Sequence, residues 1–424
     1  MPSAWTPTSG SVVSVHVISD RTDFLAACKT LSAGHGPLAI DAERASGFTY
    51  SQRAYLIQIH RRDAGTFLFD PPAIGDMSAL TPLGADTEWV FHAASQDLAC
   101  LREVGIEPQR IFDTELSARL LGMARVGLGP VMAEILDVHL AKEHSAVDWS
   151  TRPLPEPWLV YAVGDVERLV DLRDALAELL VENEKVDFAL EEFEAVRVRP
   201  EKVVSEEPWR RLSGSHVIRH AQQLAVARSL WLSRDELARA RDISPGRLIP
   251  DAAIVAASVA KLGSQADLAR LKTFTGRASR PEITRWWTAI EQGLRSQDLP
   301  ALRVPSDSIP QQRSWAEKNP PAALRLTLAR ERVTELAESL SMPVENLVSP
   351  GPLREVCWAP PSEQTVDTLT TALVAQGVRP WQASRVAPLL DEAFSLAAAE
   401  GDVATPDAEV ASTELEETSA PPTP

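Results

Sequence analysis

Three short apolar runs between residues 38 and 71 constrain the fold more than any other feature of the chain. The runs are LAIDAE, YLIQIHRR and GTFLFDP, and each is bounded by Gly, Pro or Asp. Apolar segments of this length that end at turn residues are typical of strands. HVISD and WVF, each followed by a helical pattern, predict further strands. Residues 12–190 are therefore predicted to form an α/β domain, with one long helix over 155–185 at its end.

After the α/β domain the apolar residues follow helical spacing, interrupted by Pro- and Ser-containing stretches. The predicted order is an α/β domain at 12–190, an acidic linker at 191–207, an Arg-rich helical domain at 208–295, a linker at 296–314, a second helical domain at 315–398 and an acidic disordered tail at 399–424.

The net charge of −17 argues against a nucleic-acid partner, but the charge is unevenly distributed along the chain. Residues 400–424 hold seven acidic residues and no Lys or Arg, whereas residues 208–294 hold 14 Lys and Arg against 7 Asp and Glu. A basic segment within an acidic chain is a local footprint for a polyanion.

Other features of the sequence favour a cytoplasmic protein. No stretch approaches the ~18 consecutive apolar residues of a membrane span, and the N-terminus lacks the basic and apolar regions of a secretory signal. The three cysteines are scattered and give neither a disulfide framework nor a zinc-binding spacing. No membrane partner is expected.

Four acidic residues and one tyrosine form the candidate site. Asp41 and Glu43 alternate on one predicted strand, so their side chains share a face and repel each other. Asp97 begins a helix after the strand WVFHA, and Tyr161 lies one helical turn before Asp165. Converging carboxylates suit a pair of hard divalent ions, which can activate a water and stabilise the leaving oxygen of a phosphodiester.

Each of these signals has an ordinary structural explanation when it stands alone. The Asp41–Glu43 pair fits a solvated strand end, and Asp97 fits an acidic residue placed favourably for the helix dipole. Tyr161 and Asp165 fit an amphipathic helix with an exposed acid. Only the complete set, in this order, favours a metal site.

At this point the chain resembles a known family. IDAE, VFHAASQDLACL and YAVGDVERL look like the three exonuclease motifs of the DEDD superfamily, in its tyrosine-bearing branch, and are most similar to ribonuclease D. The phrases YLIQI, IFDTELSARLLG and HSAVDWSTRPLPEPW between the motifs also resemble that family. The likeness covers about residues 15–185.

The resemblance implies a ribonuclease H-like fold and 3′→5′ exonucleolytic hydrolysis with two divalent ions, Mg²⁺ or Mn²⁺. By motif match, the metal-binding and catalytic acids are Asp41, Glu43, Asp97 and Asp165, and Tyr161 positions the attacking water. In the family's scheme Asp41 bridges both ions, while Glu43 and Asp165 complete the site of the ion that activates the nucleophile. Asp97 supports the second ion.

Arg44 departs from the family, which usually has an aromatic or aliphatic residue after the first motif. Arg44 either contacts substrate phosphate or points into solvent, and we expect a change in 3′-end handling rather than a loss of activity. His92 either lines the cleft or is a packed histidine at a strand end. Asp113 is expected to have a structural role such as helix capping, and Gln58 to be a sheet residue rather than a substrate ligand.

Residues 208–295 resemble an HRDC domain, through the phrases DISPGRLIPDAAIVAASV, LKTFTGR and TRWWTAIEQGL. Arg and Lys on such a helical bundle supply phosphate contacts that do not read sequence. Trp231, Trp286 and Trp287 are expected in the core rather than as stacking platforms. Residues 315–398 fit a second HRDC-like domain loosely. The candidate nucleic-acid contacts over the whole chain are Arg44, His92, Lys142, Arg152, Arg247, Lys272, Arg277 and Arg280.

The function expected from these residues is metal-dependent 3′→5′ exoribonuclease activity on RNA 3′ ends, such as those of tRNA precursors, by a monomer. Two alternatives stay open. The same chemistry on single-stranded DNA would give a repair nuclease, and an inactive exonuclease fold would give a nucleic-acid-binding scaffold.

Overall fold

The structure is a computed structural model that describes residues 16–84, 87–140, 144, 146–200, 205–304 and 308–403. Lys142 and most of the predicted acidic tail lie outside the described residues. The chain divides into two compact units. The first contains residues 1–116, 125–178 and 193–306, and the second contains residues 117–124, 179–192 and 307–424.

Six strands of the first unit form one mixed sheet with the order β1-β4-β3-β2-β5-β6. The strands are β1 (Val17–Ile18), β2 (His35–Arg44), β3 (Ala54–Arg62), β4 (Gly65–Phe69), β5 (Trp89–Phe91) and β6 (Ile111–Asp113). β2 pairs antiparallel with β3 along most of its length. β5 pairs with β2 only at Leu38 and Ala39. Among the described residues, no strand therefore lies beside the carboxyl end of β2 on the β5 side, which leaves room there for a cleft.

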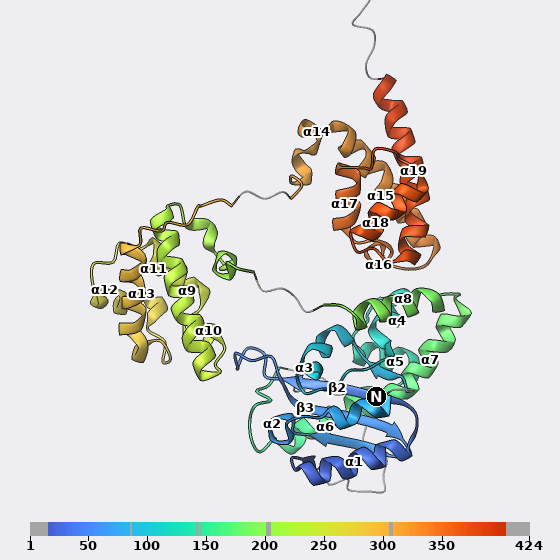
Figure 1. Cartoon of the computed structure of the whole chain (residues 1–424), viewed down its shortest axis with the longest axis horizontal. Coiled ribbons are helices and arrows are strands. Elements are labelled where there is room, and N and C mark those ends of the chain that lie inside the picture. Colours follow the sequence, from blue (N-terminus) through green and yellow to red (C-terminus); the bar gives the residue numbers. More distant parts are fainter. Residues whose placement is uncertain are drawn as a thin grey trace, which may run out of the picture. The chain divides into compact units, whose positions relative to one another are not determined.

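The helices of the α/β region include α1 (Arg21–Ala33), α2 (Pro71–Ile74), α3 (Leu98–Glu103), α4 (Thr114–Leu120), α5 (Leu128–Leu136), α6 (Glu156–Glu167), α7 (Leu169–Glu182) and α8 (Val186–Arg197). α6 packs against β2, β3 and β4, and Figure 1 labels α6 next to β3 in the sheet. Buried Leu56 of β3, Ala162 of α6 and Trp149 share one apolar cluster, and this packing fixes α6 on the sheet.

Two expectations about helices were wrong. The single helix predicted over 155–185 is broken at Arg168, where the backbone leaves helical geometry with φ −107° and ψ 5°. Apolar residues continue at helical spacing through this point, so the sequence pattern does not reveal the break. Residues 191–197, predicted as the start of a linker, belong to α8.

Residues 208–295 form a helical bundle around α9 (Ala221–Arg241) and α13 (Ile283–Arg295). Its shorter helices are α10 (Pro245–Leu248), α11 (Asp251–Val259) and α12 (Gln265–Arg270). Gly293 lets α9 and α13 approach closely, because a Cβ at this position would lie 2.5 Å from the Cα of Val226. Trp286 is fully buried in the core of the bundle, and Trp231 and Trp287 pack against that core, so the expectation for the tryptophans is confirmed.

The second unit is helical. Its helices are α14 (Trp315–Lys318), α15 (Pro320–Ser339), α16 (Val344–Leu347), α17 (Pro350–Trp358), α18 (Val366–Ala375) and α19 (Pro380–Val403), together with parts of α4, α7 and α8. The Trp381 ring of α19 stacks on Phe188 of α8 with 4.3 Å between centroids, and Arg379 forms a 2.9 Å ion pair with Glu192. The predicted fold class, an α/β domain followed by helical domains, is confirmed.

Candidate active site

A cleft of about 440 Å³ opens beside the carboxyl end of β2. All five residues of the predicted catalytic set line it, although they come from three distant parts of the sequence. The charged and polar residues of the lining are Asp41, Glu43, Arg44, Ser46, His92, Gln96, Asp97, Glu115, Tyr161 and Asp165.

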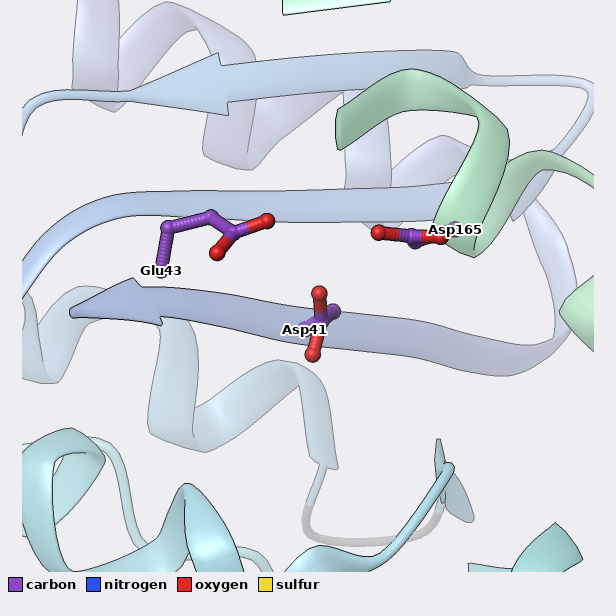
Figure 2. A group of neighbouring side chains, drawn as sticks. All are labelled: Asp41, Glu43 and Asp165. Carbon is purple, nitrogen blue, oxygen red and sulfur yellow. The ribbon is translucent and has the colours of Figure 1, made fainter. Parts of the chain in front are cut away.

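Three of the acids converge closely. Asp41 and Glu43 project from β2, and Asp165 projects from α6 toward them (Figure 2). One carboxylate oxygen from each of the three lies within 4.8 Å of the others. Asp97, which precedes the first residue of α3, lines the same cleft without belonging to this close group. The three-acid group is thus built by strand alternation on β2 and by the packing of α6.

The acids of the cleft destabilise one another's ionised form. Burial is the main reason that the pKa values of Asp41, Asp97 and Asp165 lie above their ordinary range. Burial also raises the pKa of Glu43, to about 10, and the charges of Asp41, Asp165 and Asp97 add to this effect. Asp165 is only partly exposed, so it is not the exposed acid of an amphipathic helix.

A divalent cation fits this donor set. The converging atoms are all carboxylate oxygens, which hard ions such as Mg²⁺ and Mn²⁺ prefer. A bound cation would favour the ionised carboxylates that burial and mutual repulsion disfavour. The acidic cluster is therefore consistent with a metal site.

Tyr161 lies one turn before Asp165 in α6 and shares a side-chain hydrogen bond with it. Burial, followed by the negative charges of Asp165 and Glu43, raises the pKa of the Tyr161 phenol above its ordinary value. The hydrogen bond lowers the pKa of Asp165, so the protonated Tyr161 hydroxyl is its donor, and the phenol oxygen can still accept a hydrogen bond in the cleft.

Gln58 contacts the acidic cluster, and the sequence did not predict this contact. Its side chain is fully buried in β3, opposite Asp41 in the strand register. The Nε2 atom of Gln58 donates a 2.7 Å hydrogen bond to Oδ2 of Asp41. The expected location in the sheet was correct, but the contact with Asp41 was not anticipated. The available signal was a polar residue within the otherwise apolar run LIQI.

His92 and Asp113 organise the chain between β5 and α3. His92 lines the cleft, and its Nδ1 atom lies 2.8 Å from Oγ1 of Thr114. Asp113 accepts hydrogen bonds from the backbone N–H groups of Ala93 and Ala94, at 3.1 and 2.8 Å. It also accepts bonds from the first turn of α4. The expected structural role of Asp113 is confirmed, because it caps α4 and holds the left-handed Ala93 that leads toward Asp97.

Some candidate nucleic-acid contacts are bonded within the protein and others are exposed, and their role in binding stays a prediction. Arg152 pairs with Asp70 at 2.6 Å and donates to three backbone carbonyls. The guanidinium of Arg247 donates to the carbonyl of Gly47 at 2.7 Å. Lys272, Arg277 and Arg280 are exposed on the helical bundle.

Two observations concern the setting of the whole chain. Within the described ranges, no helix is both long and apolar enough to cross a membrane. Cys28, Cys100 and Cys357 are buried and form no disulfide.

Three family models match the chain. One described as a 3′-5′ exonuclease matches residues 15–181, and the HRDC domain matches residues 223–290. Residues 308–394 match the 3′ to 5′ exonuclease C-terminal domain. This last match falls on the segment that was expected to resemble a second HRDC domain, and it carries a different description.

Similar proteins include ribonuclease D from Zymomonas mobilis, which is 31% identical over 295 residues that cover 67% of this chain and 74% of the relative. Ribonuclease D from Jannaschia sp. is 27% identical over 356 residues, covering 80% of this chain and 88% of the relative.

Solved structures with a similar fold include a protein from Bifidobacterium adolescentis, with a TM-score of 0.81, 35% identity, and coverage of 90% of this chain and 97% of that one. Escherichia coli RNase D, an exoribonuclease involved in structured RNA processing, has a TM-score of 0.65 and 22% identity, with 91% and 98% coverage. The motifs, the fold and these similarities together show that the chain belongs to the ribonuclease D family of 3′-5′ exonucleases, which hydrolyse phosphodiester bonds.

Proposed function

We propose that this exonuclease acts on RNA, removing nucleotides one at a time from 3′ ends such as those of tRNA precursors. The observation that carries the proposal is the convergence of Asp41, Glu43 and Asp165 within 4.8 Å in a cleft that Asp97 and Tyr161 also line. The choice of RNA is supported by the relatives, which are named ribonuclease D.

In this proposal Asp41, Glu43, Asp97 and Asp165 hold two divalent ions, Mg²⁺ or Mn²⁺. When bound, such ions make a water more nucleophilic and stabilise the charge on the leaving oxygen. Tyr161 orients the attacking water through its hydroxyl oxygen, which can accept a hydrogen bond from that water while the hydroxyl donates to Asp165. Gln58 donates a hydrogen bond to Oδ2 of Asp41, which leaves the Oδ1 atom of Asp41 available to a metal ion.

The helical domains are proposed to hold the body of the RNA. The domain boundaries proposed from the sequence place the HRDC domain at 208–295, where Lys and Arg outnumber acids by 14 to 7 in residues 208–294. Contacts of this kind bind the phosphate backbone without reading sequence. Action as a monomer in the cytoplasm is also proposed, and the three free cysteines fit a reducing compartment.

The test compares wild type with Asp41→Asn on three 5′-labelled substrates: a tRNA with a 3′ extension, an unstructured RNA and single-stranded DNA. Degradation in Mg²⁺ or Mn²⁺ should be abolished by Asp41→Asn and retained by Asp137→Asn. The control residue is exposed and in the left-handed region that Asn tolerates, and it does not line the cleft.

Each outcome of this assay has a defined meaning. Undiminished trimming by Asp41→Asn would refute the catalytic assignment. Faster degradation of single-stranded DNA than of either RNA would favour the repair nuclease. A wild-type protein that degrades nothing with either ion would favour the scaffold.

A further inference from the structure

We propose that Arg44 binds the scissile phosphodiester as the RNA 3′ end enters the cleft. Arg44 would thereby be a substrate-binding residue supplied by the strand that carries Asp41 and Glu43. This inference rests on the proposed function of the acidic cluster, and it extends that function by naming the group that recognises the substrate's negative charge.

The position of Arg44 is the first argument. Arg44 is the last residue of β2, directly after Glu43, and it lines the cleft. The register between β2 and β3 shifts by one residue at this point, since Glu43 pairs with Leu56 and Arg44 with Ala54. A bulge of this kind bends the local strand and changes the direction of nearby side chains. The side chain of Arg44 can therefore reach the cleft even though strict alternation along β2 would place it on the face opposite Glu43.

The free guanidinium of Arg44 is the second argument. Within the part of the chain that the structure describes, Arg44 has no hydrogen-bond or ion-pair partner. Arginines on the adjacent strand are occupied: Arg61 donates to the carbonyl of Leu31 at 2.8 Å, and Arg62 pairs with Asp171 at 2.7 Å. All N–H donors of the Arg44 guanidinium are thus available to a ligand. Its positive charge lies close enough to Asp41, Glu43 and Asp97 to lower the pKa values of these acids.

The charge balance of the site is the third argument. Two divalent ions would neutralise four ionised carboxylates, so the acids then need no arginine. The entering phosphodiester brings one further negative charge, and among the described residues of the cleft lining Arg44 is the Lys or Arg that can match it. The guanidinium fork also fits phosphate oxygens in a bidentate arrangement, which an ammonium group cannot reproduce.

This assignment predicts that substrate recognition weakens in Arg44 variants while metal affinity is retained. In Arg44→Gln, loss of a charge-assisted contact should lower kcat/KM by about tenfold to a hundredfold. Mn²⁺ affinity should stay nearly unchanged, because the lost repulsion between Arg44 and the cation is offset by the rise in the pKa values of the neighbouring acids. If Arg44 had a purely structural role, Arg44→Gln would lower kcat/KM, Mn²⁺ affinity and the melting temperature together. Arg44→Lys keeps the charge but not the fork, so it should recover part of the lost kcat/KM.

The decisive experiment measures equilibrium binding in Ca²⁺ with oligoribonucleotides that carry one uncharged methylphosphonate at the last or at the second-last linkage. Wild type should bind the oligonucleotide neutralised at the last linkage about tenfold to a hundredfold more weakly than the unmodified one. Arg44→Gln should show a much smaller difference between the two oligonucleotides, and the attraction between the bound Ca²⁺ ions and the last linkage accounts for what remains. Lys29→Gln removes the same charge from exposed α1 and should behave as wild type.

The results separate this inference from the proposed function. If Arg44→Gln discriminates at the last linkage as wild type does, or if wild type discriminates only at the second-last linkage, the assignment of Arg44 to the scissile phosphodiester is wrong. Because binding is measured without cleavage, a wild type that binds and discriminates but degrades no substrate would instead overturn the proposed activity.

Discussion

Replacing Gln58 with Leu should weaken metal binding at the acidic cluster without unfolding the protein. Gln58 is fully buried, and its Nε2 atom donates a 2.7 Å hydrogen bond to Asp41. A hydrogen bond to a charged group contributes about 1.5–3 kcal/mol. This bond favours the ionised form of Asp41, so its loss raises the pKa of that carboxyl further above the ordinary range. Since a metal binds the ionised carboxylate, we expect Mn²⁺ affinity to fall about 10-fold to 150-fold near neutral pH.

The effect on folding should be much smaller. The Oε1 atom of Gln58 is buried and has no partner among the described residues, so its removal relieves a desolvation cost. Leu has a similar volume, and the free energy of unfolding should change by about 1 kcal/mol or less without metal.

Calorimetric titration with Mn²⁺ over a range of pH, together with urea unfolding in EDTA, measures the two quantities separately. The difference in Mn²⁺ affinity should shrink as the pH rises, because Asp41 becomes ionised in both proteins. Gln109→Leu is the matched control, since Gln109 is exposed and bonds only to the carbonyl of Glu107 among the described residues. Equal Mn²⁺ affinity in wild type and Gln58→Leu at every pH would refute the reasoning.

Two further predictions concern the pH dependence of stability and the tyrosine. In EDTA the raised pKa values of the four acids mean that the folded protein holds their protons more tightly than the unfolded chain. Stability should therefore fall as the pH rises from about 4, where such groups titrate when unfolded, toward about 10, the pKa of Glu43. In thermal unfolding, saturating Mn²⁺ should make stability depend less on pH. An equal pH dependence with and without the ion would contradict this prediction. Tyr161→Phe should lower kcat roughly a hundredfold by misplacing the attacking water, while Mn²⁺ and RNA affinities hold. An unchanged kcat in single-turnover assays would exclude that role.

Local periodicity was enough to predict the pairs within the site. Strand alternation placed Asp41 beside Glu43, and helical spacing placed Tyr161 on the same face as Asp165. The approach of Asp165 to β2 depends on the packing of α6 against β2, β3 and β4. No periodicity encodes that packing, so the convergence was available only through the resemblance to a family.

Strand register limited the prediction in a different way. Gln58 meets Asp41 because the two residues are paired across β2 and β3, and that pairing depends on the connection between the strands and on the shift near Arg44. A displacement by one residue would have placed Gln58 on the other face. The sequence identified a polar residue in an apolar strand, but the partner of that residue required the coordinates.

The acidic cluster bears on the role of Arg44, for which the sequence allowed either contact with substrate phosphate or exposure to solvent. Four partly or fully buried acids with raised pKa values form an arrangement that the protein alone stabilises poorly. An arginine selected to offset that cost would be expected in an ion pair with one of them, as Arg152 is with Asp70. Arg44 makes no such pair with any described residue. We therefore expect bound cations to offset the cost of ionising the acids, and Arg44 to be available for a ligand of opposite charge.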